Sequence, residues 1–502
     1  MDLPSWLGLP TLRFGRDDRE PLQGLVLAGG GSRASFQIGA LRHLYDVVGI
    51  SPRVTVATSA GSIVACTLAQ SIDRERQSAA LRELERMWLA MEDQSDMFAP
   101  RAWFSRLLDK APEWTKLLDR EVEQDLDHHS GLGLPKLRLP FSRGDDGRTT
   151  IVDPADPVAG RDDEGLTGQA ATLALATRDD PPRQGAAWSP GVVMQVLGAL
   201  SKLTRDTGDI ATILRGADIS ASTYRAGPIL AKLLDREFFR SELLSTSGMK
   251  VRLATVALES GQLRFMTESG ELVDRDNRPI GSSAFDVSKG VLASCSIPGV
   301  FRPVELDGEH YVDGGLRENV PVEMAVGHLG VTHPYVVTCS PQGVPRSEDM
   351  SQVTMLDLVT RSISLLTDEC ERDEVAYARN AGAVVISPQL SVHDTMTVDP
   401  GLLAINRDYG WMRSAQVHLG DETGLVDEAV RLRVRGWEIE KAWLAHQASA
   451  AQMDALTEVK RRLVDVAARL PEGIAPEGVR WWGRVMERHG HAEPVDVVPW
   501  VV

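Results

Sequence analysis

Three consecutive glycines between a predicted strand and a predicted helix constrain the fold of this 502-residue chain more than any other feature. The apolar run LQGLVLA (22–28) is typical of a buried parallel strand. It leads directly into GGGSRAS, after which apolar residues recur at helical spacing over 36–48. The pattern predicts a β-α unit, and glycine at its turn indicates that another group approaches the backbone closely.

The glycine loop by itself fits two kinds of anion site. Gly29, Gly31 and Ala34 match the loose dinucleotide template Gly-x-Gly-x-x-Gly/Ala. A P-loop would require Gly-Lys-Ser/Thr after the glycines, and a dinucleotide site would require an acid at the end of the second strand. The second predicted strand, RVTVA (53–57), continues instead into TSAGS, which contains no acid. The loop is therefore predicted to stabilise a transient negative charge and not a nucleotide.

A serine follows the second strand in a tight turn. Ser59 has Ala57 two residues before it and Gly61 two residues after it, which is close to the Gly-x-Ser-x-Gly elbow of serine hydrolases. A helical pattern over 60–70 follows, and the N-terminus of a helix favours negative charge. If the two strands are neighbours in a parallel sheet, residues 29–32 face Ser59 and offer backbone N–H groups to a tetrahedral oxyanion.

The general base for Ser59 is predicted to be an aspartate. None of the eleven histidines stands in an obvious triad context. His43 lies within the first helical pattern, where it serves packing or the surface, and His310 faces a predicted hairpin partner. Asp313 ends a predicted strand, and Gly314 and Gly315 then let the chain turn away from its carboxylate.

Three separated segments together resemble the patatin-like phospholipases. The segments are GGGSRASFQIGAL, ATSAGS and SIPGVFRPVELDGEHYVDGGLRENVPV. The resemblance covers roughly 22–72 and 250–340, and more faintly 370–415. It implies a three-layer α/β/α fold with a central, mostly parallel sheet, and lipid acyl hydrolysis by a Ser–Asp dyad without metal or cofactor.

The resemblance also assigns roles to single positions. It implies that Ser59 is the nucleophile and that Asp313 is its base. It places the oxyanion loop at Gly29, Gly30, Gly31, Ser32 and Arg33. Arg33 either polarises the site or pins the loop by hydrogen bonds. Ala57 and Ala34 stand where the family usually has glycine, so each adds one methyl group in a tight place.

The rest of the chain predicts additions to the catalytic fold. We expect an N-terminal extension (1–21), a catalytic domain (22–72 and 250–415), a mostly helical insert (73–249) with a flexible acidic segment near 143–190, and a helical C-terminal region (416–502). The insert is either a helical subdomain with its own core or a lid that contacts lipid.

Composition limits the partners and the location. A formal net charge of −17 disfavours nonspecific nucleic-acid binding. No run of about 18 apolar residues predicts a transmembrane helix, and the first 20 residues lack the basic and apolar blocks of a Sec signal peptide. Four widely spaced cysteines suit reduced thiols. We expect a cytoplasmic protein, with peripheral membrane contact and oligomeric state left open.

These observations predict a serine lipid acyl hydrolase of the phospholipase A type. Its substrate would be a phospholipid or another lipid ester. Two alternatives stay open at this point. One is an esterase on soluble esters, and the other is a catalytically silent lipid-binding or scaffold protein on the same fold.

Overall fold

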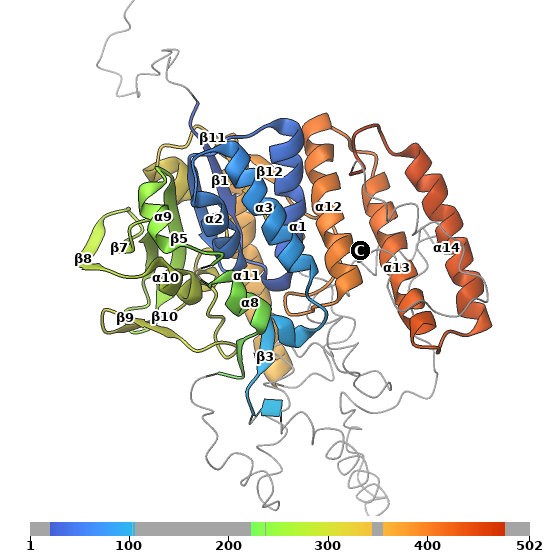
Figure 1. Ribbon diagram of the computed structural model, residues 1–502, viewed down its shortest axis with the longest axis horizontal. Coiled ribbons are helices and arrows are strands. Elements are labelled where there is room, and N and C mark those ends of the chain that lie inside the picture. Colours follow the sequence, from blue (N-terminus) through green and yellow to red (C-terminus); the bar gives the residue numbers. More distant parts are fainter. Residues whose placement is uncertain (1–20, 103, 106–221, 236, 344–354, 477–502) are drawn as a thin grey trace, which may run out of the picture.

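A mixed, mostly parallel sheet forms the centre of the molecule, and helices cover both of its faces (Figure 1). The computed structural model describes residues 21–102, 104–105, 222–235, 237–343 and 355–476. The main path of the sheet has the strand order β12-β11-β1-β2-β5-β6-β7-β8. The predicted α/β/α fold class is confirmed.

The first five strands of that path run parallel. They are β12 (Val384–Ile386), β11 (His333–Val337), β1 (Gln23–Leu27), β2 (Val54–Thr58) and β5 (Lys250–Ala257). The chain leaves β1 for β2 on one side and later returns to β11 on the other side. The strand order therefore switches direction between β1 and β11, which is where α/β folds bind ligands. The loops after β1 and β2 lie beside each other at the same edge because these two strands are parallel neighbours.

The remaining strands are antiparallel. They comprise β6 (Leu263–Thr267), β7 (Glu271–Val273), β8 (Pro279–Ala284), and the hairpin of β9 (Val304–Leu306) and β10 (Glu309–Asp313). The hairpin turns at Asp307 and Gly308, which both have positive φ, as a type I′ turn requires.

The length of β5 places the end of β10 against the end of β2. Thr58, the last residue of β2, pairs with Ala254 of β5. The residues of β5 after Ala254 no longer pair with β2. On that same edge they pair with β10, and Asp313 lies opposite Thr255. Because β10 runs antiparallel to β5, its last residue arrives next to the last residue of β2.

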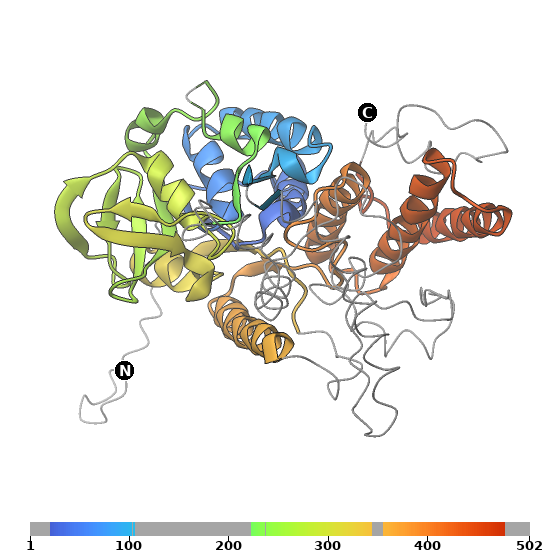
Figure 2. The ribbon, with the colours of Figure 1, turned by 90° about the horizontal axis from the view of Figure 1, so that it is seen from below.

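Alternate residues of the strands enter two separate cores. Leu25 and Leu27 of β1 face one core, and Val26 and Ala28 face the other, as the two-residue period of a strand requires. The first core contains α1 (Ala34–His43), α2 (Ala60–Ala69), α3 (Arg74–Leu89), α10 (Val287–Ser294) and α12 (Pro400–Leu419). The second contains η8 (Met324–His328) and α11 (Met355–Asn380), and Figure 2 shows α11 across the sheet from α1–α3.

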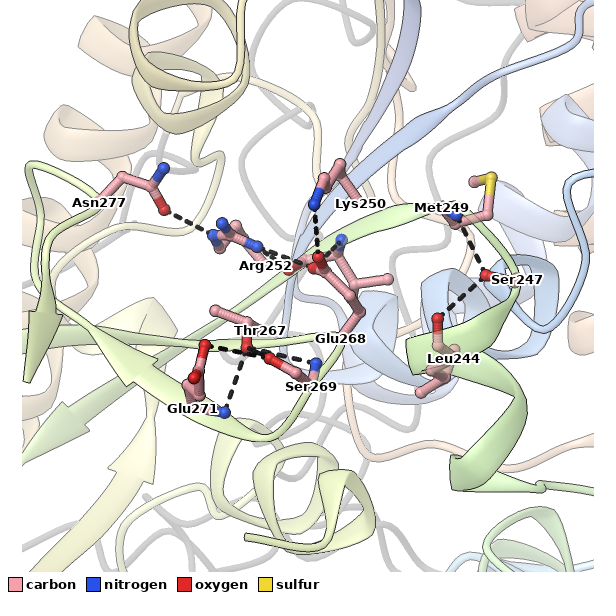
Figure 3. A network of polar contacts seen from close by, with 11 residues as sticks. Leu244, Ser247, Met249, Lys250, Arg252, Thr267, Glu268, Ser269, Glu271 and Asn277 are labelled. Atoms are coloured by element: carbon pink, nitrogen blue, oxygen red, sulfur yellow. Dashed lines mark hydrogen bonds and ion pairs between the residues drawn. The ribbon is translucent and has the colours of Figure 1, made fainter. Parts of the chain in front are cut away.

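A polar cluster fixes the start of β5 (Figure 3). Glu268 accepts hydrogen bonds from Lys250 Nζ (3.1 Å), the Val251 N–H (2.9 Å) and Arg252 Nη1 (2.9 Å). Arg252 Nε also donates to Asn277 Oδ1 (2.7 Å). Burial lowers the pKa of Arg252, and the Glu268 carboxylate opposes that effect. These bonds hold the register between β5 and β6.

Further elements of the described chain surround the sheet (Figure 1). The short pair of β3 (Phe98–Pro100) and β4 (Tyr224–Ala226), with α8 (Pro228–Leu233) and α9 (Ser241–Thr246), belongs to the region predicted as an insert. Helices α13 (Leu425–Leu444) and α14 (Ala450–Arg469) follow α12 (Figure 1). The predicted N-terminal extension (1–21, apart from Pro21) and the acidic segment near 143–190 lie outside the described residues, and the predicted domain boundaries stay a prediction.

Candidate active site

The turn between β2 and α2 holds Ser59 in a strained conformation. Ser59 has φ 53° and ψ −132°, a backbone region that a residue with a side chain rarely adopts. A Cβ atom at Gly61 would lie 2.6 Å from the carbonyl oxygen of Leu27 and 2.7 Å from that of Ala28. Only glycine therefore lets α2 begin this close to β1. Ala57 is fully buried in β2.

Helix α10 supports the same turn. The Ser59 N–H donates a hydrogen bond to Ser294 Oγ (2.9 Å), and the Ser294 and Ser62 hydroxyls bond to each other (2.8 Å). The backbone of Ser59 is thus held by a residue more than 200 positions away in the chain. Sequence reasoning missed Ser294 because a serine at a helix end carries no spacing signal.

The structure brings Ser59 and Asp313 together. The Ser59 hydroxyl donates a hydrogen bond to the Asp313 carboxylate, and each residue is 6% exposed. The Gly315 N–H also donates to Asp313 Oδ1 (2.8 Å). Burial raises the pKa of Asp313 from 3.8 to about 6, while the two hydrogen bonds act in the opposite direction. A carboxylate that binds a hydroxyl proton inside a nearly dry site is equipped to act as a base.

The two glycines after Asp313 make its turn possible. A Cβ atom at Gly314 would lie 2.6 Å from the carbonyl oxygen of Ala254. One at Gly315 would lie 3.2 Å from both Asp313 Oδ1 and Asn319 Oδ1. The first glycine allows the close approach to β5, and the second keeps space beside the carboxylate.

The glycine loop after β1 contacts Ser59 directly. A Cβ atom at Gly29 would lie only 2.9 Å from Ser59 Cβ. Three N–H groups of the predicted oxyanion segment donate within the protein: Gly29 to Asn319 Oδ1 (3.0 Å), Ser32 to the Thr395 carbonyl (2.9 Å), and Arg33 to the Gly30 carbonyl (3.1 Å). The N–H groups of Gly30 and Gly31 have no acceptor in the described part of the chain.

A distant segment around Thr395 holds the end of this loop. Arg33 Nη2 donates to Thr395 Oγ1 (2.7 Å), and the Ser32 hydroxyl donates to the Thr395 carbonyl (3.0 Å). Arg33 Nε is buried and has no partner among the described residues. These contacts pin the loop through Arg33. Nothing in the local sequence around 395 predicts them.

The two histidines considered from the sequence bond elsewhere. His43 is buried on α1, where its Nδ1 lies 2.8 Å from Ser414 Oγ, and burial lowers its pKa to about 4. His310 is exposed and pairs with Glu259. Both histidines thus have partners other than Ser59, and the pairing of Ser59 with Asp313 as a catalytic dyad stays a prediction of the sequence.

A cavity of about 560 Å³ lies apart from this pair. Its lining includes three arginines and six acidic residues, among them Glu318 and Glu374, but neither Ser59 nor Asp313. Such a charged lining does not suit an acyl chain. Within the described ranges, no three His, Cys, Asp or Glu side chains are grouped so as to hold a metal ion. None of the described helices combines the length and the apolar character needed to cross a membrane.

The comparison with known families agrees with this geometry. The sequence model of the patatin-like phospholipases matches residues 25–326, which is more than half of the chain. The chain belongs to the patatin-like phospholipase family. The match spans the glycine loop, Ser59 and Asp313, and this patatin-like chain therefore belongs to a family of lipid acyl hydrolases.

Two solved structures are distantly similar to this patatin-like chain. VipD from Legionella pneumophila is 12% identical, with 90% of this chain and 82% of VipD covered, at a TM-score of 0.32. The type III effector protein ExoU is 13% identical, with 90% and 71% covered, at a TM-score of 0.19. Similarity at this level adds nothing to the family assignment.

Proposed function

We propose that this protein is a serine lipid acyl hydrolase of the phospholipase A type, with Ser59 as nucleophile and Asp313 as general base. The hydrogen bond from the Ser59 hydroxyl to the buried Asp313 carboxylate carries this proposal. The strained backbone of Ser59 and the glycine loop beside it support the same assignment.

In the first half-reaction, Ser59 Oγ attacks the acyl carbonyl carbon while its proton passes to Asp313. The resulting oxyanion accepts hydrogen bonds from the N–H groups of Gly30 and Gly31, the two members of the loop without another acceptor among the described residues. When the tetrahedral intermediate collapses, Asp313 gives the proton to the leaving oxygen. The lysolipid departs and the acyl group stays on Ser59.

In the second half-reaction, a water molecule takes the place of the lysolipid. Asp313 removes its proton as the water oxygen attacks the acyl-enzyme carbonyl. The second tetrahedral intermediate uses the same two N–H donors. Its collapse breaks the bond to Ser59 Oγ, which regains the proton from Asp313, and the fatty acid is released.

The raised pKa of Asp313 suits this role. A base with a pKa of about 6 is a stronger proton acceptor than an ordinary aspartate, yet it is about nine-tenths ionised at pH 7. Each oxyanion donor is worth on the order of 3 kcal/mol at the barrier. The N-terminus of α2, which begins right after Ser59, adds favourable potential for the same charge.

The proposal also covers the substrate, the cellular location and the catalytic domain of the enzyme. The substrate is a phospholipid or related lipid ester, which the enzyme meets by peripheral contact with a membrane. A cytoplasmic location is supported by the four cysteines, which are all free. The catalytic domain comprises 22–72 and 250–415, which contain Ser59, Asp313 and the glycine loop.

Lipid mass spectrometry tests the proposal. Wild type, Ser59→Ala and Asp313→Asn are incubated with a mixed lipid extract presented as vesicles, and in parallel with a soluble short-chain ester. We expect free fatty acid and lysolipid from wild type only, and fluorophosphonate labelling of wild type at Ser59. If wild type hydrolyses the soluble ester but no lipid in the vesicles, the proposed lipid substrate is wrong and the enzyme is an esterase on soluble esters. If wild type hydrolyses neither substrate and is not labelled at Ser59, the proposal that this protein is a hydrolase is wrong.

A further inference from the structure

Asn319 lies between the two halves of the catalytic site without belonging to the dyad. Its Oδ1 accepts the Gly29 N–H at 3.0 Å. The same oxygen would lie 3.2 Å from a Cβ atom at Gly315. One side chain thus contacts both the glycine loop and the turn that follows Asp313.

Helix α11 holds Asn319 from the far face of the sheet. Asn319 Nδ2 donates to Glu371 Oε2 (2.9 Å), and the N–H groups of Asn319 and Val320 donate to Glu374 Oε2 (3.1 and 2.7 Å). Glu371 and Glu374 are three residues apart, so they lie on one side of the helix. Two carboxyl groups of one helix therefore fix both the backbone and the amide of Asn319.

The polarity of these contacts determines which way the amide points. With Nδ2 bound to Glu371, Oδ1 must face Gly29. The flipped amide would place its oxygen against a carboxyl oxygen and its NH₂ group against the Gly29 N–H, and it would lose both bonds. An oxygen of Glu371 can accept this bond in either protonation state.

We propose that Asn319 is a positioning residue for the oxyanion loop, and that Glu371 on α11 orients it. By accepting the Gly29 N–H, Asn319 fixes the peptide plane between Ala28 and Gly29. The next two peptides of the loop carry the Gly30 and Gly31 N–H groups, so their direction toward the oxyanion starts from this fixed plane. This inference rests on the proposed function, because it assigns a role within that reaction. A misplacement of these donors by about 1 Å costs about 100-fold in rate.

Three variants separate this role from simple packing. Asn319→Leu keeps the size but removes the acceptor, and we expect kcat to fall about 10- to 100-fold with KM changed less than about 3-fold. Asn319→Asp keeps the acceptor but turns a second oxygen toward Glu371. Adding Glu371→Gln reverses donor and acceptor, because the amide introduced on α11 can donate to the new carboxylate. The double variant is expected to recover kcat to within about 5-fold of wild type.

The matched control is Glu369→Gln on the same helix, an exposed residue that pairs with Arg372. It should leave kcat unchanged. Hydrogen exchange of the peptide 24–36 gives a readout that does not depend on turnover. Exchange should be faster than wild type in Asn319→Leu and return toward wild type in the double variant.

Each outcome decides the inference. Wild-type kcat in folded Asn319→Leu, or a double variant as slow as Asn319→Leu, would overturn the positioning role. If Asn319→Leu does not fold, the comparison of Asn319→Asp with the double variant decides alone. If wild type neither hydrolyses esters nor labels at Ser59, the proposed function fails and the catalytic role fails with it. The exchange data then still show whether Asn319 holds the loop.

Discussion

Replacing Asp313 by asparagine should abolish hydrolysis and also make the protein more stable at neutral pH. Burial raises the pKa of Asp313, so the folded state disfavours its ionised form. A carboxyl whose pKa is higher in the folded than in the unfolded state stabilises folding below the unfolded pKa. That contribution is lost as the pH rises through the folded pKa. Above about pH 6, the ionised Asp313 is therefore a stability cost that asparagine lacks.

The size of the effect follows from the pKa shift. The pKa moves from 3.8 to about 6, which is about two units. At about 1.4 kcal/mol per unit, the ionised carboxylate costs about 3 kcal/mol of folding free energy. Asparagine has the same shape, can accept the Gly315 N–H through its oxygen and can donate to Ser59 Oγ. It should therefore recover most of that cost and raise Tm by a few °C.

The assay is thermal and urea unfolding of wild type and Asp313→Asn at pH 8 and at pH 4. At pH 8 the variant should be more stable by about 2–3 kcal/mol. At pH 4 the wild-type carboxyl is already largely protonated, so the two proteins should have nearly equal stability. A variant that is no more stable at pH 8, or one that gains equally at both pH values, would refute the link between burial, pKa and stability.

Three further predictions concern rate and stability. The acidic limb of kcat/KM should report an apparent pKa of about 6, because protonated Asp313 cannot accept the serine proton, and a limb near pH 4 would exclude Asp313 as the base. Gly61→Ala should lower the free energy of unfolding by about 1–3 kcal/mol and remove most of the activity, because its methyl group would meet the carbonyl oxygen of Leu27. The control Gly327→Ala should be tolerated, because the nearest atom to its methyl group would be 3.8 Å away. Equal Tm and kcat for the two variants would contradict this prediction. Glu268→Gln should lower the free energy of unfolding by about 1–3 kcal/mol by removing the carboxylate from the cluster at the start of β5, and an unchanged urea midpoint would count against that cluster.

The turn at Ser59, the turn after Asp313 and the glycine loop could be predicted because each depends on local steric rules. The turn at Ser59 requires a very small residue at position 61, since a Cβ atom there would meet two carbonyl oxygens of the neighbouring strand. The turn after Asp313 requires glycine for the same reason. Such constraints restrict the residue types at a few adjacent positions, so they can be recognised in the sequence without any knowledge of the tertiary structure.

The partners of these residues could not be predicted in the same way. Ser294, Thr395 and Glu371 bond to the site from positions far along the chain. Each is a common residue in an ordinary helical or loop pattern, and a single hydrogen bond places no demand on its neighbours in sequence. Sequence reasoning treated residues 29–33 as one oxyanion segment. The structure shows that three of their N–H groups donate within the protein, which is why the proposal uses only Gly30 and Gly31.

The sequence by itself determined that this chain makes a strand, a glycine turn and a helix, then a second strand that ends in a strained serine. It also determined that a strand ends in Asp313 before two glycines. The tertiary structure decided that these ends meet. Strand β5 is longer than its partner β2, which ends at Thr58. Strand β10 pairs with the rest of that edge of β5, and this places Asp313 opposite Thr255. Strand pairing depends on hydrogen bonds between backbones distant in sequence, and these bonds form alike for almost any side chains.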